Sequence, residues 1–110
     1  WCAITKQMFI LGDDKDCKGD VWWTGNVKPH QAKHFDRFEE HGGKSCVLLR
    51  MKDRSRWVLP WKLLRPIWVN GGSISLDNIE KYGLKWKHKC VGEPNYDWLS
   101  PLQEFYNASQ

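Results

Sequence analysis

The sequence has no long hydrophobic run, and apolar stretches such as Val47–Leu49 are far too short to span a membrane. It also lacks the charged start, apolar stretch and small-residue cleavage site of a secretory signal peptide. Both absences favour a soluble globular protein. The chain opens at Trp1 rather than at Met, inside a segment with strand character, so we expect a further N-terminal portion in the full protein.

Cysteine pairs of the CxxC type are absent as well. The four cysteines, Cys2, Cys17, Cys46 and Cys90, are widely spaced. This spacing is unlike that of a zinc ribbon or of a small disulfide-dense domain. We therefore expect reduced and mostly buried thiols in an intracellular protein.

The sequence does contain enough apolar material for a small core. Of its 110 residues, 41% are hydrophobic and 27% are charged, as in ordinary globular domains. Eight tryptophans add a large area for burial per residue. Because there is no internal repeat and no linker-like segment, the chain is predicted to be one domain spanning residues 1–110.

Positive charge is concentrated in one segment of the chain. Residues 41–65 contain seven Lys or Arg and one acidic residue, a net charge of +6. Residues 1–40 have six basic and seven acidic residues, and residues 66–110 have four and five, so each segment carries −1. This arrangement fits a protein that holds a cation beside a polyanion, although a solvated basic hairpin would give the same pattern.

Local patterns predict a mixed α/β chain. Strands are expected at Trp1–Thr5, Met8–Leu11, Val21–Thr24, Ser45–Arg50 and Arg56–Leu59, the last two forming a β-hairpin. A helix is expected to begin at Pro29, which suits a first helical position, and to end at the glycine pair that starts at Gly42. Its buried stripe consists of Ala32, Phe35 and Phe38.

The rest of the chain is predicted in shorter pieces. Trp61–Arg65 forms about one helical turn, which Pro66 ends. Ser75 caps a short helix that runs through Lys81–Tyr82. Leu84–Cys90 alternates as a surface strand with Lys85, Lys87 and Lys89 on one face, and Asp97 caps a final helix over Trp98–Tyr106. The expected fold class is therefore α/β, with a single small mixed sheet and flanking helices.

Two acid-x-Lys triplets follow the second predicted strand, within the polar stretch Gly12–Asp20. They are Asp13-Asp14-Lys15 and Asp16-Cys17-Lys18. On an extended chain, residues two apart point to the same face, so each triplet places a carboxylate beside an ammonium group. The carboxylate can bind Mg²⁺, and the lysine can orient water and stabilise charge on a phosphate. Such triplets also occur in solvated charged loops, so their context decides their meaning.

The order of the next motifs supplies that context. Lys28-Pro29-His30-Gln31 opens the predicted helix, Gly42-Gly43 ends it, and Val47–Arg50 and Leu59-Pro60-Trp61 lie on the hairpin. This succession resembles the PD-(D/E)xK nuclease superfamily, and within it the Holliday-junction-resolvase-like and virus-type replication-repair nucleases that are common in phages. The resemblance covers residues 1–65 best, and the closing Asp97-Trp98-Leu99 is similar as well.

The resemblance implies a restriction-endonuclease-like core and hydrolysis of DNA phosphodiester bonds that depends on Mg²⁺ or Mn²⁺. Two pairs compete for the roles of metal-binding acid and catalytic lysine: Asp16 with Lys18, and Asp13 with Lys15. The first pair is preferred, because the apolar Cys17 between its members fits a strand with one buried face. The second pair is favoured by its place directly after an apolar strand.

Gln31 would be the helix residue that helps to position the site. The family also has an Asp on the strand before the acid-x-Lys strand, whereas residues 1–12 contain no Asp or Glu. Either that Asp precedes Trp1 or the site is degenerate. The alternative function is therefore a catalytically inactive nuclease-fold protein that binds DNA or a partner protein. A small aromatic reader barrel around Gly19–Trp23 is a third hypothesis, which the long helix from Pro29 disfavours.

Basic side chains indicate where DNA would bind. The residues predicted to contact it are Lys28, Lys44, Arg50, Lys52, Arg54, Arg56 and Lys62. Alternating cations on the hairpin would lie on one strand face and follow a phosphate backbone. The resemblance implies branched or duplex DNA as the partner, a homodimer as the assembly, no membrane, and the cytoplasm of a bacterial or phage-infected cell.

Overall fold

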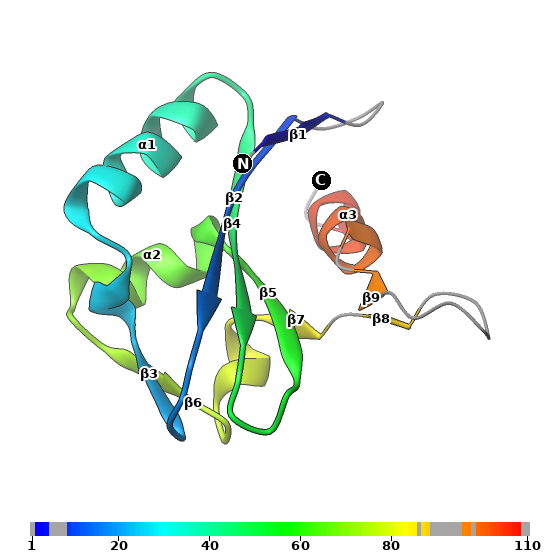
Figure 1. The fold of residues 1–110 in the computed structure, drawn as a ribbon. Coiled ribbons are helices and arrows are strands. Elements are labelled where there is room, and N and C mark those ends of the chain that lie inside the picture. The colour runs from blue at the N-terminus through cyan, green and yellow to red at the C-terminus, as the bar shows by residue number, and fades with distance from the viewer. Residues whose placement is uncertain (1, 5–8, 86, 89–95, 98, 109–110) are drawn as a thin grey trace.

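Five strands form one mixed sheet in the computed structural model, which describes residues 2–4, 9–85, 87–88, 96–97 and 99–108. In spatial order they are β1 (Cys2–Ile4), β2 (Phe9–Asp16), β4 (Lys44–Arg50), β5 (Arg56–Pro60) and β7 (Leu84–Lys85). β2 and β4 are parallel, and the other neighbouring pairs are antiparallel (Figure 1). The predicted hairpin is confirmed as β4 and β5.

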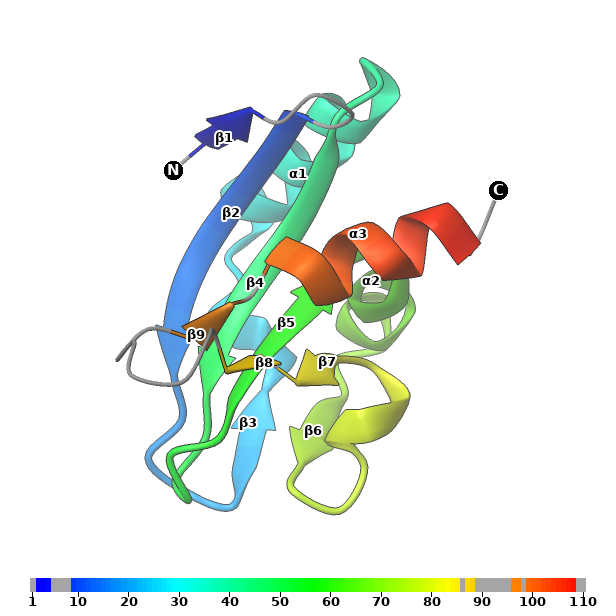
Figure 2. The same ribbon diagram turned by 90° about the vertical axis from the view of Figure 1, so that its right-hand side faces the viewer.

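Helices cover both faces of this sheet. α1 (Pro29–Glu40) and α2 (Trp61–Val69) lie on one face, and α3 (Leu99–Ala108) lies on the other (Figures 1 and 2). The smaller elements are β3 (Val21–Trp23) paired with β6 (Ser73–Ser75), β8 (Lys87–His88) paired with β9 (Tyr96–Asp97), and the 3₁₀ helices η1 (Thr24–Asn26) and η2 (Ile79–Lys81). The predicted α/β class is confirmed. In the described parts of the chain, no helix has the length and apolar character needed to cross a membrane.

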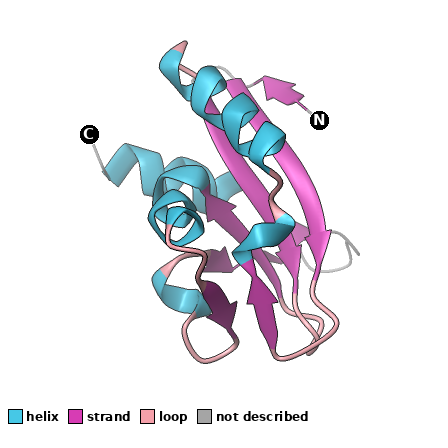
Figure 3. Ribbon diagram, turned by 90° about the vertical axis from the view of Figure 1, so that its left-hand side faces the viewer, coloured by secondary structure: helices cyan, strands magenta, loops and turns pink. Residues whose placement is uncertain are grey.

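α1 lies in the crossover between the two parallel strands, which cannot be joined by a tight turn. It begins at Pro29, whose missing N–H would be unpaired in the first turn anyway. After its end, Gly42 has a φ of 89°, a left-handed conformation that glycine adopts without strain, and the Gly43 N–H donates to the Phe38 carbonyl at 3.0 Å. The helix predicted from Pro29 to the glycine pair is confirmed, and Figure 3 views it from the side that α1 and α2 cover.

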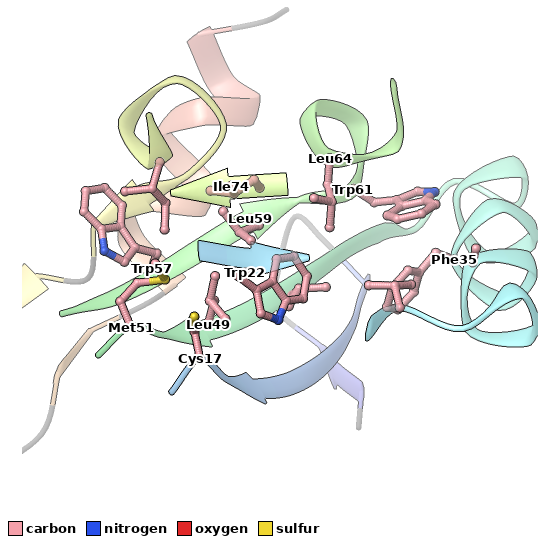
Figure 4. Close-up of a cluster of buried hydrophobic side chains, with 14 residues drawn as sticks. Cys17, Trp22, Phe35, Leu49, Met51, Trp57, Leu59, Trp61, Leu64 and Ile74 are labelled. Carbon is pink, nitrogen blue, oxygen red and sulfur yellow. The ribbon is translucent and has the colours of Figure 1, made fainter. Parts of the chain in front are cut away.

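Two hydrophobic clusters pack on the two sides of the sheet. The larger one lies beneath α1 and α2 (Figure 4). In it the fully buried Trp61 ring is 5.2 Å from the Phe35 ring and 5.8 Å from the Trp68 ring, measured between centroids. The smaller one joins Leu48 of β4 to Leu102 of α3. Because burying a large apolar side chain stabilises a fold by roughly 2–3 kcal/mol, the larger cluster fixes α1 firmly to the sheet.

The described cysteines agree with the expectation of buried thiols. Cys17 and Cys46 are free and buried, whereas the Cys2 side chain and Cys90 lie outside the described parts. Burial, with a smaller effect of the Asp14 and Glu39 charges, raises the pKa of Cys46 to about 12. The thiolate is the reactive form of cysteine, so Cys46 is inert at neutral pH.

α2 continues through Pro66, where the sequence pattern wrongly predicted its end. The proline removes one backbone donor from the helix. Beyond it, Ile67 and Trp68 pack against the larger cluster, and the Trp68 indole N–H donates to the Val27 carbonyl at 2.7 Å. The helix then closes where the Gly72 N–H donates to the Ile67 carbonyl at 3.0 Å. These tertiary contacts outweigh the loss of the backbone hydrogen bond that Pro66 cannot donate.

Two other predictions fail in the C-terminal half. Ser75 ends β6 instead of capping the predicted short helix, because its N–H donates to Asn78 Oδ1 at 2.7 Å and only η2 follows. The predicted strand Leu84–Cys90 is divided, since β7 pairs with β5 and β8 pairs with β9. Parts of the predictions lie outside the described residues: residues 1 and 5–8 of the first strands, residues 86 and 89–90, and residue 98 of the last helix.

Candidate functional site

β2 extends to Asp16, so both acids of the acid-x-Lys triplets lie on a strand and not in the polar stretch that the sequence pattern predicted after it. Pairing is the reason, because Gly12–Asp16 aligns with Cys46–Arg50 of β4. Asp and Gly are poor strand formers, yet pairing with a buried strand outweighs that preference. The acids therefore have defined directions relative to the sheet.

The register divides the charged residues of β2 between the two faces of the sheet. Asp13 and Lys15 lie beside Val47 and Leu49, whose side chains belong to the cluster beneath α1 and α2. Asp16 lies one residue beyond Lys15 and so points to the face on which α3 packs. The two acids considered as metal ligands, Asp13 and Asp16, are on opposite faces.

Asp13, Lys15 and Gln31 form a hydrogen-bonded cluster between β2 and α1, which we call the α1-face cluster. Lys15 Nζ lies 3.1 Å from Asp13 Oδ2 and 3.5 Å from Gln31 Oε1. Gln31 Nε2 donates to Asp13 Oδ2 at 2.9 Å. The Lys15 and Asp13 side chains are 22% and 32% exposed, so the cluster is partly buried but accessible to a ligand.

The first turn of α1 holds the Gln31 side chain in place. Gln31 is the third residue of the helix, and its Oε1 accepts a hydrogen bond from the Lys28 N–H at 3.0 Å. The bond satisfies one of the backbone donors that a helix N-terminus leaves unpaired. It explains how Lys28, a poor capping residue, can precede the helix, and it ties the cluster to the helix start.

Asp36 anchors α1 to α2 further along the helix. Its Oδ1 accepts hydrogen bonds from Trp61 Nε1 at 2.7 Å and from Arg65 Nε at 2.9 Å. Burial raises the pKa of Asp36, but the hydrogen bonds from Trp61 and Arg65 and the Arg65 charge outweigh it and hold that pKa below its ordinary value. Sequence reasoning missed this anchor, and the signal available was the spacing of four between Trp61 and Arg65, which places both on one helix face.

Asp16 and Lys18 lie apart from the α1-face cluster. Asp16 ends β2 and binds Arg50 of β4 through two contacts, Nε to Oδ1 at 3.1 Å and Nη2 to Oδ2 at 3.3 Å. Lys18 lies two residues beyond β2 and is exposed, with the buried Cys17 between them. The structure therefore brings Gln31 to Asp13 and Lys15, whereas Asp16 lies on the other side of β2.

The sequence pattern predicted that the basic residues of the β4–β5 hairpin alternate along one strand face. In the structure they do not. Arg50 and Arg56 lie opposite each other in the last pair before the turn. Lys52 and Arg54 lie in the turn itself, because β4 already ends at Arg50. All four nevertheless line one hollow of about 650 Å³ at the hairpin tip, together with Lys18.

The other predicted DNA contacts lie elsewhere. Lys28 precedes α1, Lys62 is on α2, and Lys44 begins β4 with its Nζ 4.8 Å from the centre of the Tyr106 ring. Their contact with DNA stays a prediction. Of the predicted lysine face, Lys85 and Lys87 belong to two different sheets, and residue 89 lies outside the described residues.

A metal ion at the α1-face cluster would find one carboxylate. Proteins often bind Mg²⁺ through one or two carboxylates together with water and substrate phosphates, so Asp13 fits as a ligand. Within the described residues, no group of three or more His, Cys, Asp or Glu side chains could hold a metal. In the β1–β2 register Cys2 lies opposite Leu11, so the amino end of β1 runs toward Asp13.

Comparison with known proteins decides the family. The family model of recombination protein U (RecU) matches residues 1–103, which include the α1-face cluster and the basic hairpin. The chain belongs to the RecU family. RecU proteins are Holliday-junction resolvases that act in recombination, so the prediction of a resolvase-like nuclease is confirmed at the level of the family. No curated protein sequence matches the chain.

Proposed function

We propose that this RecU-family chain is a DNA endonuclease that hydrolyses phosphodiester bonds at the α1-face cluster with Mg²⁺ or Mn²⁺. The observation that carries the proposal is the connection of Asp13, Lys15 and Gln31 by contacts of 2.9, 3.1 and 3.5 Å. A carboxylate, an ammonium group and an amide from two elements converge at a partly buried place, where the Lys15 and Asp13 side chains keep 22% and 32% of their surface exposed. This is the chemistry that metal-assisted phosphodiester hydrolysis needs.

Each residue of the cluster has its own role. Asp13 would hold the metal ion, which when bound polarises the phosphate and activates water. Lys15 carries a positive charge that would stabilise the negative charge developing on the phosphoryl oxygens. Gln31 holds the Asp13 carboxylate in position through its Nε2, and the Lys28 N–H holds Gln31.

Asp13 and Lys15 are the better-supported pair in this proposal. Gln31, the helix residue of the site, contacts both of them, whereas Asp16 faces the other side of the sheet and binds Arg50. The assignment of Asp16 and Lys18 stays a prediction that variants of the two pairs can test.

The nuclease resemblance implies a further acidic ligand, an Asp on the strand before β2, whereas residues 1–12 contain no Asp or Glu. The register of β1 against β2 brings the amino end of β1 toward Asp13. An acidic residue there would lie on the strand adjacent to Asp13. Two carboxylates on neighbouring strands would complete the set through which Mg²⁺ is usually bound.

The RecU family supports a branched DNA, the Holliday junction, as the substrate. The net charge of +6 over residues 41–65 supports binding of a polyanion. We extend the proposal to membership of the PD-(D/E)xK superfamily, one nuclease-like domain over residues 1–110, a homodimer that acts on the two strands of a junction, and the cytoplasm of a bacterial or phage-infected cell.

Cleavage of a labelled four-way junction, beside a linear duplex of the same sequence, tests the proposal. Lys15→Ala is expected to slow single-turnover cleavage in Mg²⁺ by roughly 10²–10³-fold, because a positioned charge is lost from the transition state. Lys33→Ala, which removes an equal charge from an exposed position on α1, is the control and is expected to keep the wild-type rate. If Lys18→Ala lost cleavage and Lys15→Ala kept it, the active site would lie at Asp16 and Lys18 and not at the α1-face cluster.

One observation favours a second function. Among the three members of the α1-face cluster, Asp13 alone carries a carboxylate, and one acid gives weaker metal binding than two. A protein of this kind would hold the junction without cutting it. Salt-sensitive binding without cleavage in Mg²⁺ or Mn²⁺ would support this function, and absence of both binding and cleavage would contradict both functions.

A further inference from the structure

We propose that the tip of the β4–β5 hairpin is a second phosphate-binding site, next to the α1-face cluster, and that Asp16 occupies it until DNA binds. We call it the hairpin groove: two adjoining hollows of about 250 and 650 Å³ that share Asp16, Arg50 and Arg56. The inference rests on the proposed function, in which DNA is the ligand. It adds that one DNA phosphate binds in the hairpin groove and competes there with the Asp16 carboxylate.

The charge of the groove fits a polyanion. The larger hollow is lined by five cationic residues, Lys18, Arg50, Lys52, Arg54 and Arg56, and by one acid, Asp16. A second acid, Asp20, lies 3.8 Å from Lys52 Nζ, and Asp14 lines the smaller hollow. The excess of positive charge in a concave place raises the local concentration of phosphate groups.

The contact between Arg50 and Asp16 has the geometry of a phosphate contact. The guanidinium presents Nε and Nη2 to the two carboxylate oxygens at 3.1 and 3.3 Å. A phosphodiester offers two oxygens to the same pair of N–H donors, since arginine binds carboxylates and phosphates with one fork geometry. Asp16 therefore stands where a DNA phosphate would bind, and it keeps Arg50 oriented for that phosphate.

The ion pair is open enough to be exchanged. The Arg50 and Asp16 side chains are 53% and 60% exposed, whereas Lys15 and Asp13 in the α1-face cluster are 22% and 32% exposed. Ion pairs as exposed as that of Arg50 and Asp16 stabilise a fold little, because water screens them. A DNA phosphate with several cations around it can thus displace Asp16 at small cost.

Arg54 adds a backbone observation to the charge. It has a φ of 68°, a left-handed conformation usual for Gly and Asn in turns and uncommon for a long side chain. Strain of this kind is typically retained at functional positions. Arg54 is the fourth cationic residue of the hairpin that lines the larger hollow.

The position of β2 lets one DNA molecule reach both sites. Lys15 and Asp16 are neighbours on β2, and both line the smaller hollow together with Arg50 and Arg56. A DNA molecule that places one phosphate at Arg50 can therefore place another at Lys15.

A double-mutant cycle on junction binding tests the inference. Fluorescence anisotropy in EDTA over a salt series would compare the wild type, Asp16→Asn, Arg50→Gln and the double variant, with thermal melting to check folding. Asp16→Asn is expected to tighten binding at low salt by a factor of roughly three to ten and to steepen the log–log salt slope by about 0.9. Arg50→Gln is expected to weaken binding, and in its presence Asp16→Asn is expected to have little effect.

Asp77→Asn controls for the change in net charge, because it makes the same replacement at an exposed turn outside both hollows. Equal tightening in Asp77→Asn, weaker or unchanged binding in Asp16→Asn, or tightening that persists without Arg50 would overturn the inference. Cleavage of the same junction in Mg²⁺ separates it from the proposed function. Tightening by Asp16→Asn that depends on Arg50, without cleavage, would support the hairpin groove but not the nuclease. Cleavage without any effect of Asp16→Asn on binding would support the nuclease but not the groove.

Discussion

The two faces of β2 hold their charged side chains in different ways. On the α1 side, Asp13 and Lys15 are partly buried, and Gln31 bonds to both from a helix fixed by the larger hydrophobic cluster. On the other side, Asp16 and Arg50 are mostly exposed and contact each other at the end of a hairpin. The first arrangement keeps three groups in one geometry, and we propose that the second exchanges a carboxylate for a phosphate.

We propose that this difference lets one short strand serve two purposes. Alternation along β2 sends residues 13 and 15 to one face and residues 14 and 16 to the other. What then separates a reactive site from a binding site is the support behind each face. A packed helix preorganises side chains for chemistry, whereas an open turn leaves them free to adapt to a ligand.

The largest effect is expected when the packing that fixes α1 to the sheet is removed. Trp61→Ala is expected to lower the free energy of unfolding by about 3–5 kcal/mol, because it removes a fully buried indole that also bonds Asp36. Trp23→Ala is the matched control, since Trp23 is 55% exposed, and it should cost less than about 1 kcal/mol. Urea unfolding followed by far-UV circular dichroism measures both, and equal losses would contradict the packing described for α1.

A smaller effect is expected when the charged contact between α1 and α2 is removed. Asp36→Asn is expected to cost a few tenths to about 1 kcal/mol at neutral pH, because the partly exposed carboxylate loses its charged contact with Arg65.

Since the pKa of Asp36 is lower in the folded protein than its ordinary value, its contribution is complete above about pH 4 and is lost as pH falls through the folded pKa. Wild type and variant should therefore converge in acid when urea unfolding is measured across pH. Glu40→Gln at the exposed end of α1 is the control, and a difference that grew with acid would contradict the sign of the pKa change.

The smallest expected effect acts on the exposed side. Arg54→Asn should stabilise the fold by a few tenths to about 1 kcal/mol, because Asn tolerates a positive φ better than Arg. The same change should weaken junction binding by removing one cation from the hairpin groove. Lys52→Asn, in the same turn, should weaken binding without the gain in stability. A loss of stability in Arg54→Asn would contradict the strain at this turn.

Local sequence patterns predicted the elements that depend on neighbouring residues. Pro29, the spacing of Ala32 and Phe35, and the glycine pair from Gly42 define α1 almost completely. The hairpin of β4 and β5 follows from two apolar runs around a charged turn. Both are set by residues within about a dozen positions, so their patterns are visible in the chain itself.

Features that depend on distant contacts could not be predicted in this way. The last residues of β2 form a strand only because β4 pairs with them, some thirty positions later. Pro66 stays inside α2 because Ile67 and Trp68 pack on the larger cluster. For the same reason the sequence pattern favoured Asp16 with Lys18 and could not predict that Gln31 contacts Asp13 and Lys15.

We propose that one face of β2 carries the cleavage reaction and the other binds a DNA phosphate. The most direct test compares Asp13→Asn with Asp16→Asn on one labelled four-way junction. Binding is measured in EDTA and single-turnover cleavage in Mg²⁺ at saturating protein. We expect Asp13→Asn to bind like the wild type and to cleave more than about 100-fold more slowly, because a metal ligand is lost. We expect Asp16→Asn to bind more tightly and to continue cutting. Loss of cleavage in Asp16→Asn with normal cleavage in Asp13→Asn would contradict the account.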